Sequence, residues 1–181
     1  GYGGEWGMEQ YVRDARIIQI YEGANGVQAR DRVGRNRAQN GGRAVQLFFR
    51  IVGEDSAAAK GDPRTAAFAE ALEKANGQLQ AATMWLMQNA MTNPNNAGAA
   101  SYHYMHMMGV VAVGLMWLRM AKAAAAALDA GDGDTAWLEA KLVTARYYAE
   151  RIMPDAGALR RKIEAGSEAM MALPPEMFAA R

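Results

Sequence analysis

Helix packing in this chain is decided by the stretch FAEALEKANGQLQAATMWL, residues 68–86. Its apolar side chains recur at alternating steps of four and three residues, which places them along one narrow seam of an α-helix. That seam consists of Phe68, Leu72, Ala75, Leu79, Ala82 and Leu86. Two later segments repeat the spacing, one with Leu138, Leu142, Ala145, Ala149 and Ile152, the other with Leu159, Ile163, Gly166, Met170 and Leu173. Such seams suit helices that pack near-parallel or antiparallel, so we expect an all-α fold, a helical bundle.

The chain around these seams supplies further helices and the breaks between them. Residues 99–128 are apolar on almost every side between Tyr104 and Leu118, which predicts a helix buried among others. Residues 43–52 predict a short helix crowded with apolar side chains. Breaks are predicted at residues 93–96, at residues 129–133 and at Pro154, where Asn, Gly and Pro interrupt the helical pattern.

Methionines gather in the most apolar of these segments, at positions 105, 107, 108, 116 and 120. We expect them to fill an irregular core, because an unbranched thioether adapts to uneven gaps. A groove for an acyl chain is the alternative. The apolar end of the chain, residues 174–178, is expected to pack back on the bundle or on a partner.

Composition limits the classes of function. The chain has 181 residues, a formal net charge of +1 and no cysteine. The balanced charge gives no global case for binding nucleic acid, and the lack of cysteine excludes disulfides and thiolate metal sites. The most apolar run, Gly109 to Leu118, is shorter than a bilayer requires and ends at Arg119, so we expect no membrane span.

Near the start of the chain, a carboxylate stands where one predicted helix gives way to the next. Glu22 follows a helical pattern over residues 8–20 and precedes Gly23, which is a plausible helix stop. The apolar residues Ile17, Ile18 and Ile20 precede it, and such a wall can desolvate a carboxylate and raise its pKa. A raised pKa is what a general base near neutral pH needs, although a Glu at a helix end is more often solvated.

The amino-acid sequence of this segment resembles a known family signature. Gly1-Tyr2-Gly3-Gly4, then Arg13-Asp14-Ala15-Arg16, then Ile20-Tyr21-Glu22-Gly23 match in order and spacing the carboxyl-end signature of acyl-CoA dehydrogenases. The match covers residues 1–28 and is more specific than an isolated glycine motif. The layout of the later helices also resembles the carboxy-terminal extension of the family branch that includes 3-methylmercaptopropionyl-CoA dehydrogenases.

This resemblance implies a role for each residue around Glu22. In the family, the Glu of this motif abstracts the α-proton of an acyl-CoA thioester while FAD accepts the β-hydrogen as hydride. Gly23 would lie beside the substrate thioester. The implied FAD contacts fall on Gly1, Ala24, Asn25 and Gly26. Ala24 stands where the family usually has Thr, so any contact from position 24 must use the backbone.

The resemblance also implies how the chain is divided and what it works with. Residues 1–40 would be the end of the family's carboxy-terminal helical domain, including a second helix over residues 27–40. Residues 41–181 would be an appended helical bundle, with the boundary at Asn40-Gly41-Gly42. The chain opens inside a glycine element without an initiator Met, so we expect a fragment of a larger enzyme, inactive by itself. The implied partners are acyl-CoA, electron-transfer flavoprotein as electron acceptor and further copies in a homo-oligomer, in the cytoplasm.

Two other classes of function stay open. The heptad-like seams are also typical of a non-catalytic helical interaction or oligomerisation module. A metal-binding four-helix bundle is the other alternative, but the paired Glu-x-x-His motifs of such bundles are missing. His103 and His106 are three residues apart without a nearby carboxylate in sequence, so we expect them to be structural rather than metal ligands.

Overall fold

The protein is described by a computed structural model that covers residues 4–21 and 42–178, with only the main chain considered at Trp6 and residues 17–21. The described elements are all helical, which confirms the predicted all-α bundle. A 3-10 turn, η1 (Gly4–Trp6), precedes α1 (Glu9–Tyr21). The bundle itself consists of α3 (Arg43–Ala59), α4 (Pro63–Thr92), α5 (Pro94–Ala130), α6 (Thr135–Arg151) and α7 (Asp155–Glu164), and a last 3-10 turn, η4, spans Pro175–Phe178.

Short polar connections fix where the bundle helices begin and end. Asp62 caps α4 by accepting a hydrogen bond from the Arg64 backbone N–H, and Pro63 occupies the first turn, where no N–H is needed. Asp134 caps α6 in the same way. Gly131, with φ of 66°, ends α5 in the left-handed conformation that glycine adopts without strain. The predicted breaks at residues 129–133 and at Pro154 are confirmed. The break predicted at residues 93–96 is confined to Asn93, because α5 already begins at Pro94.

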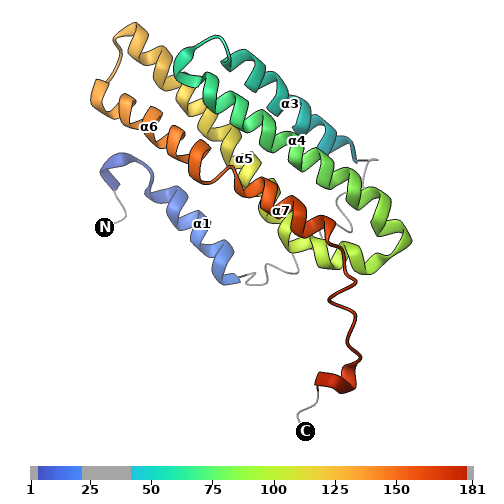
Figure 1. The fold of residues 1–181 in the computed structure, drawn as a ribbon. Coiled ribbons are helices and arrows are strands. Elements are labelled where there is room, and N and C mark those ends of the chain that lie inside the picture. Colours follow the sequence, from blue (N-terminus) through green and yellow to red (C-terminus); the bar gives the residue numbers. More distant parts are fainter. Residues whose placement is uncertain (1–3, 22–41, 179–181) are drawn as a thin grey trace.

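The bundle is built around the antiparallel pair α4 and α5. Figure 1 shows α3 beside α4, and α6 followed by α7 along the length of the bundle. Helix α5 packs against α3, α4, α6 and α7. It is also the one described helix long and apolar enough to cross a membrane by length and composition, a property that a central bundle helix shares. The core is formed chiefly by Val52, Leu72, Leu79, Leu86, Tyr104, Met107, Val111, Leu118 and Ile163, each with no exposed surface.

Two of the three predicted seams hold, and the third holds only at Leu159 and Ile163. All six seam residues of α4 are buried, and Leu138 and Ala145 carry the seam of α6 into the core. The seam predicted over residues 159–173 ends early, because α7 stops at Glu164 and Gly166 takes a φ of 68°. Met170 and Leu173 are consequently 65% and 53% exposed.

Three smaller expectations need correction. Helix α3 runs to Ala59 rather than Val52, because Ser56 and Ala59 are buried in the bundle and extend its packing beyond Gly53. Among the five clustered methionines, Met107 is buried, whereas Met116 and Met120 are exposed on the outer face of α5. The end of the chain leaves the bundle in Figure 1, and Phe178 is 71% exposed, so residues 174–178 do not pack back on the described helices. Packing of this segment on a partner stays a prediction.

Candidate functional site

The residues that the sequence singles out for chemistry lie outside the described part of the chain. These are Gly1, Glu22, Gly23, Ala24, Asn25 and Gly26. The predicted helix over residues 27–40 and the boundary at Asn40-Gly41 lie outside it as well. The roles given to these residues therefore stay predictions.

Helix α1, which leads to Glu22 in the sequence, is described as far as Tyr21. Three apolar side chains at the start of this helix are solvent-exposed, with Met8 at 56%, Tyr11 at 69% and Val12 at 44%. The polar motif residues have partners on α1 itself, since Arg13 pairs with Glu9 at 3.2 Å and Asp14 accepts a hydrogen bond from Gln10 at 2.9 Å. These three side chains leave apolar surface exposed at the start of α1.

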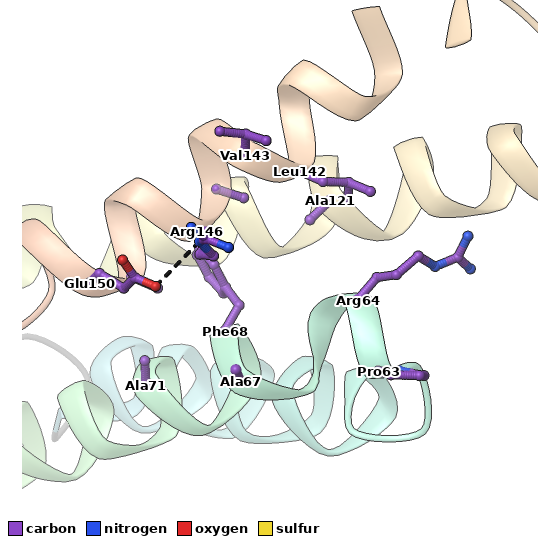
Figure 2. Close-up of a pocket in the computed structure, with 12 residues that line it drawn as sticks. Pro63, Arg64, Ala67, Phe68, Ala71, Ala121, Leu142, Val143, Arg146 and Glu150 are labelled. Atoms are coloured by element: carbon purple, nitrogen blue, oxygen red, sulfur yellow. Dashed lines mark ion pairs between the residues drawn. The ribbon is translucent and has the colours of Figure 1, made fainter. Parts of the chain in front are cut away.

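A hollow in the described bundle lies between α4 and α6, with α5 as its floor (Figure 2). It has a volume of about 420 Å³, within the roughly 300–1,000 Å³ usual for small-molecule sites. Phe68 projects from α4 toward α6 in Figure 2 and is itself 5% exposed. The remaining wall is mostly small or aliphatic, formed by Ala67, Ala71, Ala121, Leu142, Ala145 and Ala149.

Two features explain this hollow: small side chains on α4 and α6, and a change of direction between α6 and α7. Helix α6 packs mainly on α5, whereas α7 packs on both α4 and α5, so the two follow different paths past α4. The change of path falls at Ile152–Pro154, between the two helices. Alanines on the facing sides of α4 and α6 do not fill the space that this divergence opens.

A second hollow of about 420 Å³ adjoins the first. It is lined by α4, by the end of α6 and by the start of α7, and it shares Ala71 and Ala149 with the first hollow. Together the linings of the two hollows extend along α4 from Pro63 to Gln78, a span of about 22 Å at the rise of an α-helix. We call these two adjacent hollows the α4 groove.

The two ends of the α4 groove differ in their charge. At the first end, Arg64 is bound by two carboxylates: its Nη1 and Nη2 donate to Asp129 at 2.8 and 2.7 Å, and its Nη2 donates to Asp62 at 2.6 Å. The hydrogen bonds from Arg64 lower the pKa of both Asp62 and Asp129 and raise the pKa of Arg64. Arg146 at the same end pairs with Glu150 at 3.3 Å. The charge of each arginine there is thus already balanced by an acid.

Lys74 and Arg161 line the other end of the α4 groove, and neither has an ion-pair partner among the described residues. Gln78 and Gly157 lie at the same end. Gln78 accepts a hydrogen bond from Arg160 at 3.2 Å, while Arg160 also binds Glu164 at 2.7 Å. This end of the groove therefore presents two uncompensated positive charges.

The two histidines lie elsewhere, on α5. The His106 ring is stacked on Tyr102 with ring centroids 4.2 Å apart, and its Nδ1 lies 3.0 Å from the Tyr102 carbonyl oxygen. Burial lowers the pKa of His103, and the nearby charges of Lys162 and His106 lower it further. Within residues 4–21 and 42–178, no group of three or more His, Asp or Glu side chains could hold a metal ion.

The α4 groove is not among the features that the sequence predicts. A signal for it is present, because Ala67, Ala71 and Ala75 on α4 and Ala145 and Ala149 on α6 place small residues at helical spacing on two packed faces. Ala75, Ala145 and Ala149 are also positions of the predicted seams. Only the diverging paths of α6 and α7 turn these small residues into the wall of a groove.

Similarity to known proteins identifies the family. Residues 47–174 match the family described as "Acetyl-CoA dehydrogenase C-terminal like". The chain is also 33% identical over 164 residues to 3-methylmercaptopropionyl-CoA dehydrogenase of Ruegeria pomeroyi, covering 90% of this chain and 28% of that protein. It is 32% identical over 186 residues to the broad-specificity linear acyl-CoA dehydrogenase FadE5 of Mycobacterium tuberculosis, covering 98% of this chain and 30% of that protein.

The chain belongs to the acyl-CoA dehydrogenase family, in its "C-terminal like" helical part. The resemblance inferred from the first 28 residues, and the branch with a helical extension, are thereby confirmed. The chain spans less than a third of the length of the relatives that it matches.

Proposed function

We propose that this chain forms the carboxy-terminal part of an FAD-dependent acyl-CoA dehydrogenase, an oxidoreductase that introduces the α,β double bond of an acyl-CoA thioester. The observation that carries the proposal is the motif running from Arg13 through Glu22 at family spacing, in a chain whose later residues match the same family. Both named relatives are dehydrogenases of CoA thioesters. Electron-transfer flavoprotein is the proposed acceptor, and a homo-oligomer in the cytoplasm is the proposed state of the parent enzyme.

Glu22 is the proposed base in this reaction. The thioester carbonyl acidifies the α-carbon, and the Glu22 carboxylate takes the α-proton as the β-hydrogen leaves with its electron pair. The isoleucines before Glu22 would keep water from the carboxylate and hold its pKa up, which suits a base near neutral pH. Gly23 has no side chain and would leave room for the thioester.

FAD, when bound, supplies the acceptor for the hydride. Gly1, Ala24, Asn25 and Gly26 are the residues proposed to contact its adenine-diphosphate side, with Ala24 limited to backbone hydrogen bonds. The rest of the flavin and substrate site would come from parts of the parent that precede these residues, because the relatives are more than three times as long as this chain.

The test is Glu22→Gln in the full-length parent, with Glu9→Gln as the control. The amide keeps the shape of the side chain but cannot accept the proton. We expect FAD to stay bound and flavin reduction by acyl-CoA to slow by about 10²–10⁴-fold. Glu9 is an exposed α1 carboxylate paired with Arg13, and its substitution should leave reduction unchanged. Normal flavin bleaching by substrate in the Glu22 variant would remove this residue from the role of base.

The isolated chain should behave differently from the parent. We expect a folded helical protein that carries no flavin colour and oxidises no acyl-CoA with an artificial electron acceptor, because most of the site is built elsewhere. Stoichiometric flavin retained through purification would contradict this expectation.

A second candidate function is a helical interaction or oligomerisation module. Met8, Tyr11 and Val12 of α1 favour it, because they are exposed and apolar. Covering apolar surface with a partner lowers the free energy of the system. The two functions are compatible in one parent enzyme.

A further inference from the structure

We propose that the α4 groove binds an aliphatic carboxylate, with the alkyl chain lying along Ala71 and Ala149 toward Phe68 and the carboxylate between Lys74 and Arg161. The groove belongs to the bundle of α4 to α7, so this proposal does not depend on the role of Glu22. It rests on three features of the groove: its shape, its apolar wall and the asymmetry of its charges.

The shape of the groove suits a long, thin ligand. The two hollows meet at Ala71 and Ala149, where both walls carry only a methyl group. An extended alkyl chain is the ligand shape that suits a passage between two such methyl groups. The combined length of about 22 Å along α4 accommodates a medium or long chain.

The wall chemistry favours the alkyl part of such a ligand. Ala71, Leu142 and Ala149 are only partly buried and present hydrocarbon to the first hollow. An alkyl chain laid against them removes apolar surface of both partners from water.

The charges indicate which end the carboxylate occupies. Arg64 is held by Asp62 and Asp129, so an anion at that end would meet two carboxylates beside one guanidinium. Lys74 and Arg161 have no acid partner in the described chain, and both line the second hollow. An anionic head is therefore favoured at the α7 end, and the uncharged end of the chain near Phe68.

Two substitutions block the α4 groove at different points. Ala149→Leu fills the junction of the two hollows. Gly157→Leu fills the α7 end, where a Cβ would meet only the flexible end of Arg161, at 3.9 Å. Ala140→Leu is the matched control, because Ala140 is an exposed alanine on the same helix as Ala149 but outside the groove.

The experiment is a calorimetric titration of the 181-residue chain and its variants with decanoate below its micelle concentration. We expect saturable binding of one decanoate per chain. Ala149→Leu and Gly157→Leu should each raise Kd at least tenfold, while Ala140→Leu should leave it unchanged. Thermal unfolding followed by circular dichroism establishes that each variant is folded, and if Ala149→Leu is not, Gly157→Leu decides the outcome.

The head-group arm uses Lys74→Gln combined with Arg161→Gln, and decanol as the uncharged probe. Loss of the two exposed cations should raise the Kd for decanoate by about three- to fivefold for each charge and remove its salt dependence. The Kd for decanol should not change. The proposal is overturned if the binding of decanoate does not saturate, or if both blocking variants bind decanoate normally. It is also overturned if Ala140→Leu weakens binding as much as Ala149→Leu does. Binding of an acidic amphipathic peptide without binding of decanoate would overturn it as well.

Discussion

The hydroxyl oxygens of Thr83 and Tyr104 lie 2.9 Å apart in the buried interface of α4 and α5. Thr83 also donates to the Leu79 carbonyl oxygen of its own helix at 2.8 Å. Tyr104 is the largest side chain in the bundle described here that has no exposed surface. Because a hydrogen bond requires a particular direction as well as a particular distance, this buried hydroxyl pair helps to fix the register of α4 against α5.

Tyr104→Phe should therefore destabilise the bundle by about 0.5–1.5 kcal/mol, the usual net contribution of a hydrogen bond. The ring stays in place, so no large cavity forms. Urea unfolding of the variant measures the loss, and a double-mutant cycle with Thr83→Val isolates the coupling between the two side chains. Tyr102→Phe, an exposed neighbour on α5, should change stability by less than about 0.5 kcal/mol. Equal effects at positions 102 and 104 would contradict this interpretation.

Two glycines of α5 should respond in opposite ways to alanine. Nothing lies within 4 Å of a Cβ built on Gly109, whereas a Cβ on Gly114 would lie 3.0 Å from a methyl group of the fully buried Leu72. We expect Gly109→Ala to stabilise the protein by about 0.5–1 kcal/mol through helix propensity. Gly114→Ala should lose that gain, because Leu72 cannot move into solvent to make room. Thermal unfolding compares them, and a more stable Gly114 variant would show that the α4–α5 contact yields easily.

The cluster of Asp62, Arg64 and Asp129 should make the bundle sensitive to acid. The folded pKa of each carboxyl lies below its ordinary value of 3.8, because Arg64 hydrogen-bonds the charged form. A lowered folded pKa stabilises the fold above the unfolded pKa, and this contribution is lost as the pH falls through the folded pKa. Arg64→Gln should therefore be less stable than the parent chain at pH 7, and the difference should shrink as the pH falls below about 4.

Urea midpoints at several pH values measure this convergence. Arg146→Gln is the control, because its ion pair with Glu150 is 77% and 58% exposed and should matter little at any pH. A difference between Arg64→Gln and the parent chain that stays constant down to pH 2 would mean that Arg64 acts through packing alone.

The isolated chain should self-associate through α1, most simply as a symmetric dimer. Met8, Tyr11 and Val12 form an exposed apolar face, and apolar patches on isolated proteins tend to find partners. Light scattering across a concentration series measures the mass. Tyr11→Glu combined with Val12→Lys should shift the equilibrium to the monomer. A constant mass of one chain at all concentrations would show that the face is covered in another way.

Periodicity was sufficient to predict the bundle. The seam from Phe68 to Leu86 is visible in the sequence as apolar residues at steps of four and three. All six of its positions are buried in the structure, so the sequence pattern and the packing agree. The prediction failed at Met170 and Leu173, where the same spacing continues past Gly166 although no helix remains to be covered. Periodic apolar residues predict which face of a helix would be buried, but they do not predict where the helix ends. Here the helix ends just before a glycine with left-handed backbone angles.

The proposed catalytic residues could be predicted from the sequence, whereas the α4 groove could not. Glu22 could be singled out because a motif is local and its order along the chain is its signature. The groove depends on how far α6 diverges from α4 around Pro154, and on Arg64 meeting Asp129, a residue 65 positions away. No local pattern encodes such long-range placements, so the sequence predicts Ala149 only as a seam position and gives no role to Ala71.

Asn93 links α4 and α5 by itself. Its backbone N–H donates to the Asn89 carbonyl oxygen, its side-chain oxygen accepts from the Asn95 N–H at 3.1 Å, and its side-chain nitrogen reaches Ser167 at 3.4 Å. A connection of one residue cannot absorb an insertion. An inserted residue would therefore rotate one helix by about 100° relative to the other and turn its core face outward. Natural or engineered length variation should therefore be excluded at this corner and accommodated at the Gly131–Gly133 turn, which makes the latter the place to attach a tag or split the chain.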